Sequence, residues 1–289
     1  MKLFGLRTAS KPNALPGQGD GSAGELEPPK AGMAEMGFLD HLEEFRWTLI
    51  KGFSGLIIAT IGCSFFSRWI IDELLLGPKK PTFFMYRFFG IDATTFDLQN
   101  RTITGQFFAH IGTILVVGII IGSPLFVYQL WKFIEPGLYP SEKKGLRFAS
   151  VFATVFFTLG ILFGYLIITP LALQFFANYT ISPDILNEFD ISRYFSMVTF
   201  WAFGAGVLFE LPVVVYFLAK LGIATPVGLR NARKYAVPIV LTLAAFLTPP
   251  DPISQILVAI PLMALYEGSI FIAAFVERKR ERELKAALE

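Results

Sequence analysis

Six long runs of apolar residues constrain the fold of this chain more than any other feature. A run of about twenty apolar residues matches the roughly 30 Å hydrocarbon core of a bilayer when it forms an α-helix. Hydrophobic residues make up 54% of the chain and charged residues only 17%, which excludes a soluble protein of this size. We therefore predict an all-α membrane protein with six transmembrane helices, at 47–66, 107–130, 148–170, 195–220, 236–248 and 255–276.

We expect the last two of these helices to be short. The run at 236–248 would measure only about 20 Å as a helix, less than the hydrocarbon core. Pro238 also lies near its start. The helix therefore either thins the bilayer locally or is sheltered inside the protein.

A proline lies near the middle of three other predicted helices. These residues are Pro124, Pro212 and Pro261. Proline removes one backbone hydrogen bond and kinks a helix. Three helices bent in this way predict a concave bundle.

Lysine and arginine residues in the short loops predict the orientation of the chain. They gather in the loops at 131–147 and 220–235 and after residue 277, which indicates the cytoplasmic side. Both termini are therefore expected in the cytoplasm, with the long loop 67–106 outside. The predicted regions are a disordered tail at 1–36, a six-helix membrane domain at 37–276 and a charged cytoplasmic tail at 277–289.

Missing motifs exclude several classes of function. The sequence contains no nucleotide-binding glycine loop, no H-E-x-x-H motif and no G-x-S-x-G motif. Its one cysteine, Cys63, permits neither a disulfide framework nor a cysteine-based zinc site. A net charge of +2 gives no electrostatic support for nucleic-acid binding. We expect a protein that is not an enzyme and has no metal, no cofactor and no nucleic-acid partner.

Glu210 is the strongest local signal, because it lies near the middle of the predicted helix at 195–220. A carboxylate inside a bilayer costs roughly 2.5–3.5 kcal/mol on insertion scales, so it should face a cavity or a partner. One interpretation is a polar point on a substrate or proton route, which would suit a proton-coupled small-solute transporter. The alternative is a neutral carboxyl group that is hydrogen-bonded within the bundle. The same two readings apply to Glu267 in the last helix.

Two further carboxylates lie at the predicted cytoplasmic surface. Residues 37–49 have apolar residues on one helical face, which predicts an amphipathic helix on the membrane surface that carries Glu44. Together with Glu142, it would suit a cationic ligand, since arginine pairs with carboxylates bidentately. Alternatively, Glu44 is an exposed surface charge and Glu142 complements a helix dipole behind a Ser141 cap. Outside, Asp251 is predicted to cap the last helix near Ser254.

Four stretches resemble motifs of the TatC family, the multi-spanning component of twin-arginine protein translocases. They are HLEEFR at 41–46, WKFIEPGLYPSEKK at 131–144, FGAGVLFELP at 203–212 and FLTPPDPISQ at 246–255. The resemblance covers roughly residues 37–276. It implies a core receptor subunit in the bacterial cytoplasmic (inner) membrane that exports folded proteins with the proton gradient.

The resemblance also implies roles for individual residues. Glu44 and Glu142 match acids that receive the two arginines of a signal peptide, and Glu210 matches an intramembrane glutamate. The other implied signal-peptide-binding residues are Arg46, Phe133, Pro136, Leu138 and Lys143. The positions implied for docking a partner helix at the outer hairpin are Thr248, Asp251 and Gln255. The implied partners are twin-arginine signal peptides of folded cargo, single-span TatA/TatB-type subunits, further copies of the chain in a larger complex, and the lipid bilayer.

Overall fold

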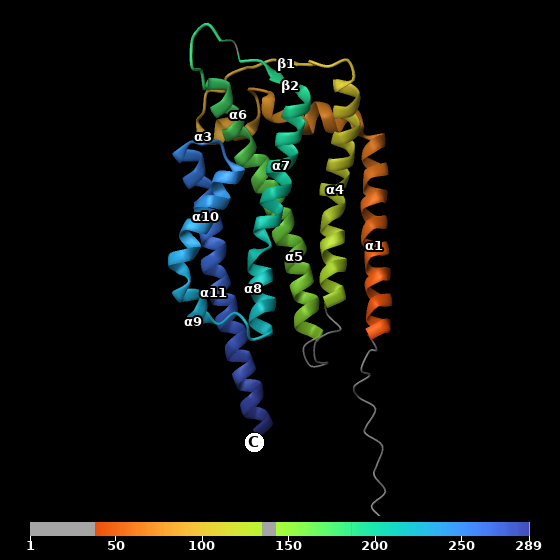
Figure 1. The fold of residues 1–289 in the computed structure, drawn as a ribbon, viewed down its shortest axis with the longest axis vertical. Helices are drawn as coiled ribbons and strands as arrows, with labels where there is room; N and C mark the ends of the chain where they lie inside the picture. The colour runs from red at the N-terminus through yellow and green to blue at the C-terminus, as the bar shows by residue number, and fades with distance from the viewer. Residues whose placement is uncertain (1–37, 135–142, 186, 289) are drawn as a thin grey trace, which may run out of the picture.

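The computed structural model describes residues 38–134, 143–185 and 187–288 and shows long helices standing side by side (Figure 1). Among these residues, five helical stretches are long and apolar enough to cross a membrane, in agreement with five of the six predicted spans. The stretches are α1 (Phe38–Phe65), α4 (Gly105–Ile134), α5 (Lys143–Phe163) continued by η5 (Gly164–Ile168) and α6 (Thr169–Asn178), α7 (Ile191–Phe209) followed by α8 (Leu211–Lys220), and α11 (Pro252–Leu288).

The sixth predicted helix is α10 (Arg233–Leu247), which follows the short helix α9 (Pro226–Asn231). Its 15 residues extend about 22 Å, so the predicted short helix is present and packs against α11. The prediction that the last helix is also short is wrong, because α11 has 37 residues. The charged segment after residue 277 continues α11, since it consists of the strong helix formers Glu, Arg, Lys, Leu and Ala.

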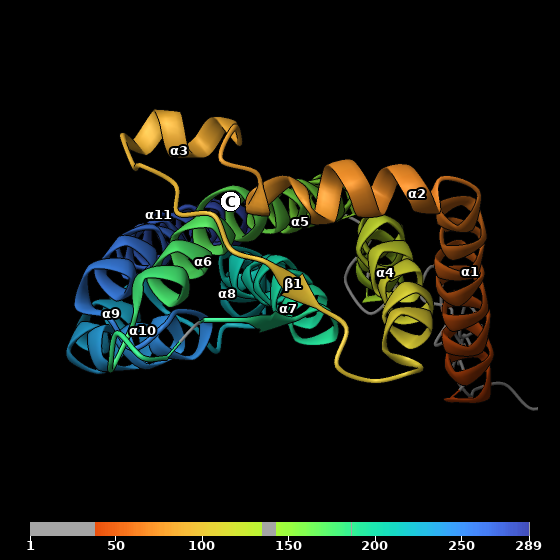
Figure 2. The ribbon, with the colours of Figure 1, turned by 90° about the horizontal axis from the view of Figure 1, so that it is seen from above.

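The predicted surface helix at 37–49 is not a separate element. Instead, α1 runs unbroken through this segment and stands at one edge of the bundle, packed against α4 (Figures 1 and 2). No Gly or Pro between residues 38 and 51 interrupts the helix, and its charged residues are good helix formers. The prediction of a surface helix that turns into a span is therefore wrong, and Glu44 lies in the first turns of a span helix.

The three mid-helix prolines have different consequences for the backbone. At Pro212 the helix is interrupted, because α7 ends at Phe209 and α8 begins at Leu211. In contrast, α4 continues across Pro124 and α11 across Pro261. The concave bundle expected from three kinks stays a prediction.

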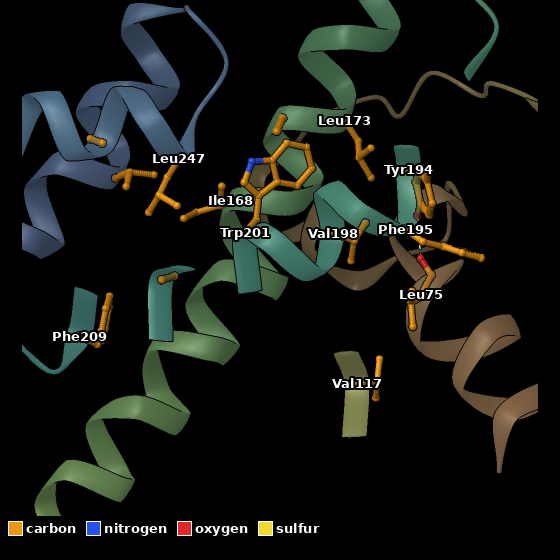
Figure 3. Close-up of a cluster of buried hydrophobic side chains, with 14 of the residues drawn as sticks. Leu75, Val117, Ile168, Leu173, Tyr194, Phe195, Val198, Trp201, Phe209 and Leu247 are labelled. Atoms are coloured by element: carbon orange, nitrogen blue, oxygen red, sulfur yellow. Dashed lines mark hydrogen bonds between the residues drawn. The ribbon is translucent and has the colours of Figure 1, made fainter. Parts of the chain in front are cut away.

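The largest buried cluster has α7 at its centre and includes residues of η5, α6, α10, α11 and α4. Trp201 of α7 is near its centre, with Ile168 of η5 and Leu247 of α10 beside it (Figure 3). Gly164 makes this packing possible, because a Cβ atom there would lie 2.3 Å from the Trp201 carbonyl oxygen. The missing side chain lets two spans touch backbone to backbone, as small residues commonly do in membranes.

The predicted outer loop 67–106 is folded into a cap, defined here as residues 66–104. The cap connects the end of α1 to the start of α4 and extends across one end of the bundle (Figure 2). Its elements are α2 (Ser67–Trp69), the π-helix η1 (Ile70–Leu75), the 3₁₀ helix η2 (Gly77–Lys79), α3 (Phe84–Phe89) and β1 (Leu98–Gln99). A short parallel pairing of β1 with β2 (Phe189–Asp190) joins the cap to the segment that precedes α7.

Three tyrosines fasten the cap through hydrogen bonds from their hydroxyl groups to its backbone. Tyr86 belongs to the cap, whereas Tyr165 and Tyr194 come from η5 and α7. Burial raises the pKa of Tyr86, so its hydroxyl stays a neutral donor. The acceptors are Pro78 O for Tyr86 at 2.5 Å, Leu74 O for Tyr165 at 2.5 Å and Leu75 O for Tyr194 at 2.7 Å.

Candidate functional sites

Glu44 lies on the face of α1 that packs against α4. It precedes Gly55 by eleven residues, about three helical turns, and a Cβ on Gly55 would lie 2.6 Å from Leu125 of α4. Glu44 is half-buried, and its Oε2 atom is buried without a hydrogen-bond partner among the described residues. A buried acceptor in this state is stabilised when a donor reaches it.

The two charged neighbours of Glu44 lie elsewhere on α1. Glu43 and Arg46 are both exposed. Arg46 follows Glu44 by two residues, which is about 200° around the helix, so it lies on the opposite face. The structure therefore does not bring Arg46 together with Glu44, although both were predicted to bind one ligand.

The remaining predicted signal-peptide-binding residues belong to the connection between α4 and α5. Phe133 is in the last turn of α4, and Lys143 is the first residue of α5. The predicted positions Pro136, Leu138 and Glu142 lie outside the described residues. The end of α4, the start of α5 and the start of α1 are at the same end of the bundle (Figure 1). Both ends of this connection are therefore on the side of the molecule that carries Glu44.

Glu210 lies at the interruption between α7 and α8. Its carbonyl oxygen accepts hydrogen bonds from the backbone N–H groups of Val213 and Val214, each at 3.0 Å. Pro212 has no backbone N–H, and this explains why the helix restarts at this position. Both carboxylate oxygens of Glu210 are buried. A buried carboxyl group at a break inside an apolar stretch marks a candidate functional site.

Glu267 has a structural explanation. Its Oε2 atom is 2.6 Å from Nη2 of Arg233 at the start of α10. The neighbouring Tyr266 donates its hydroxyl to Leu229 O at 2.6 Å. These contacts hold the short α10 and α9 against α11. Sequence analysis missed Arg233 as the partner, because the two residues are 34 positions apart.

The turn between α10 and α11 carries the three residues predicted to dock a partner. Asp251 Oδ2 accepts a hydrogen bond from the Ser254 N–H at 2.7 Å, so the predicted cap of the last helix is confirmed. Thr248 donates its hydroxyl to Ala244 O, and Gln255 donates its amide to Leu241 O. In the part of the chain that the structure describes, Asp251 Oδ1 is buried without a hydrogen-bond partner. The Asp251 Oδ1 atom is therefore an acceptor that a donor from outside the described residues could satisfy.

Comparison with known proteins places these sites in a family context. Residues 40–261 match the family model described as "Sec-independent protein translocase protein (TatC)". A relative of that name from Blattabacterium sp. subsp. Periplaneta americana is 37% identical over 260 residues, which cover 85% of this chain and 98% of the relative. Another from Aquifex aeolicus is 34% identical over 252 residues, covering 87% and 100%.

The fold also matches a solved structure. A crystal structure described as "Twin Arginine Translocase Receptor- TatC in DDM" has a TM-score of 0.65 and 34% sequence identity to this chain. The match covers 81% of this chain and 99% of that chain. The similarity therefore extends over nearly the whole length of these relatives.

Proposed function

Since the chain belongs to the TatC family of Sec-independent protein translocase proteins, we propose that it is the twin-arginine translocase subunit that receives signal peptides at its cytoplasmic face. The observation that carries this proposal is the buried Glu44 Oε2 atom, which has no hydrogen-bond partner among the described residues. Glu44 is near the start of α1, which is at the end of the bundle where α4 and α5 are connected (Figure 1). A carboxylate in this position is ready to accept a donor from outside the chain.

The chemistry of a twin-arginine ligand fits two acids at this end. Each guanidinium group is a planar fork that a carboxylate accepts through two parallel hydrogen bonds. Glu44 would bind one arginine, and Glu142 the other. Around them, the connection between α4 and α5 would shape the site with Phe133, Pro136, Leu138 and Lys143, whereas Arg46 on the opposite face of α1 is better placed to contact lipid headgroups.

Replacing Glu142 with lysine tests this assignment. We expect Glu142→Lys to abolish photocrosslinking of an Arg-Arg signal peptide to a probe at position 48, which is four residues after Glu44 on the same face of α1, because the lysine repels the guanidinium groups. Membrane insertion should be unchanged. Glu43→Lys, an exposed substitution on the same helix as Glu44, is the matched control and should crosslink normally. Normal crosslinking by the Glu142→Lys variant would falsify the assignment.

The outer turn and Glu210 are proposed to serve the other steps of transport. Single-span TatA/TatB-type subunits would dock near Thr248, Asp251 and Gln255, where Asp251 Oδ1 can accept a hydrogen bond from a partner helix. Further copies of the chain would join the larger complex. Glu210 would be the polar contact within the membrane for a partner or the cargo. Export at the wild-type rate by a Glu210→Ala variant would count against this role.

We also propose the orientation of the chain in the bacterial inner membrane. Both termini would lie in the cytoplasm and the cap outside, with the proton gradient driving export. The basic residues around α9 and the exposed charged residues 277–282 of α11 support this orientation. Labelling of an introduced Asp184→Cys thiol by an impermeant reagent, in cells with an intact inner membrane but a permeabilised outer membrane, would test it. The small-solute transporter is not favoured, because the relatives are named as protein translocase components.

A further inference from the structure

Helix α3 presents two large aromatic side chains to the surroundings. Phe84 and Phe88 are four residues apart, so they lie on one helical face, and they are 56% and 77% exposed. On the other face, Met85 and Tyr86 are buried, with 7% and 1% exposure. Figure 2 shows α3 extending away from the helices of the bundle. The exposed face is therefore not part of the protein core.

The orientation of this face is determined by the buried side of the helix. The Tyr86 hydroxyl donates to Pro78 O, and the Phe83 ring lies edge-on to the Tyr165 ring at 5.9 Å between centroids. Gly90 ends the helix in the left-handed region with φ of 65°, which favours glycine. These contacts turn Phe84 and Phe88 outward.

The contact with Tyr165 also indicates the depth of α3. Tyr165 belongs to the apolar stretch Val151–Asn178. Tyr165 lies about 21 Å along the helix from Val151 and about 20 Å from Asn178, so it is inside a hydrocarbon core of roughly 30 Å wherever the core lies along this stretch. Phe83, which packs against this residue, directly precedes α3, so α3 begins beside a residue at hydrocarbon depth and not in bulk water. Figure 1 agrees, because α3 lies near the level of the turn between α10 and α11.

We propose that α3 is an interfacial lipid anchor, with Phe84 and Phe88 inserted into the outer leaflet beside the bundle. Amphipathic helices with aromatic residues on one face lie in the membrane interface in this way. Arg87 is exposed at the flank of this face and forms no ion pair among the described residues, which suits a position near lipid phosphates. Because the Tyr86 hydroxyl holds α3 against Pro78 of η2, the anchor would hold this part of the cap at the membrane surface.

A spin label at position 88 tests this proposal. The full chain carrying Cys63→Ser and Phe88→Cys is labelled and reconstituted into vesicles of phosphatidylethanolamine and phosphatidylglycerol. The expected result is a label that is accessible to oxygen and has lost accessibility to a water-soluble nickel chelate. The matched control is Asp184→Cys, at an exposed position of the loop before β2, whose label should remain accessible to the chelate.

Two results would overturn the proposal. Access of the chelate to position 88 equal to that at position 184 would place α3 in water. An immobilised label that neither oxygen nor the chelate reaches would mean that a protein, either a second copy or a partner, covers this face. Phe84→Cys repeats the measurement on the same face if the first variant does not fold. None of these readouts depends on signal-peptide binding.

Discussion

Replacing Glu44 with glutamine should weaken signal-peptide binding without destabilising the protein. The Glu44 Oε2 atom is buried, and no donor in the described ranges of the chain contacts it. Loss of the charge therefore breaks no hydrogen bond of the described structure and removes the cost of burying an uncompensated carboxylate. The free energy of unfolding is expected to stay the same or to rise.

The effect on binding follows from the hydrogen bond that arginine would make. A hydrogen bond to a charged group contributes about 1.5–3 kcal/mol, and about 1.4 kcal/mol corresponds to a tenfold change in Kd. The Glu44→Gln variant should therefore bind an Arg-Arg signal peptide about ten to a hundred times more weakly. A Lys-Lys peptide, which lacks the guanidinium fork, should lose less from the same substitution.

Two measurements on the chain in lipid nanodiscs test both parts of this prediction. Fluorescence anisotropy of a labelled signal peptide gives Kd, and a fluorogenic maleimide reports thermal unfolding by reacting with Cys63, which is 6% exposed in the folded state. The control is Glu43→Gln, which changes an exposed carboxylate one residue away. Equal weakening by Glu43→Gln would show a general electrostatic effect. A loss of stability in Glu44→Gln would show that this carboxylate already has a partner inside the protein.

Three further predictions concern packing, the cap and the outer turn. Gly164→Ala should destabilise the protein by about 1–3 kcal/mol through overpacking against α7, whereas Gly112→Ala should have no effect because a Cβ there would meet nothing within 4 Å. Equal unfolding midpoints of the two variants by circular dichroism would contradict this prediction. Tyr194→Phe should lower the free energy of unfolding by about 1–3 kcal/mol and speed hydrogen exchange in the cap, whereas replacing the exposed Tyr179 with Phe should change neither quantity. Unchanged hydrogen exchange in the cap of the Tyr194→Phe variant would refute the role of its hydroxyl. Asp251→Asn should keep the hydrogen bond from the Ser254 N–H but reduce copurification of single-span partners, whereas Asp251→Ala should also lose about 1 kcal/mol of stability. Normal copurification with the Asp251→Asn variant would argue against docking at this carboxylate.

Sequence patterns predicted well what depends on neighbouring residues. The apolar runs indicated the long helical stretches and the short α10, because hydrophobicity and helix length are properties of one segment. The N-terminal capping of α11 by the Asp251 carboxylate was also predictable, since a helix-capping hydrogen bond spans only three residues. Predictions of where helices end were weaker. The continuity of α1 and the length of α11 were both missed, because a change from apolar to charged residues does not end a helix.

By itself, the sequence determined that the chain is an apolar helical membrane protein with few charges, and its four motifs pointed to one family. Only the tertiary structure decided which of these charges already have a partner. Arg233 and Glu267 meet across 34 residues, whereas Glu44 faces α4 with one oxygen that accepts no hydrogen bond from any described residue. The folded cap and the outward face of α3 also arise from contacts between distant segments. Such contacts depend on how helices cross and which faces they share, and no local pattern along the chain contains that information.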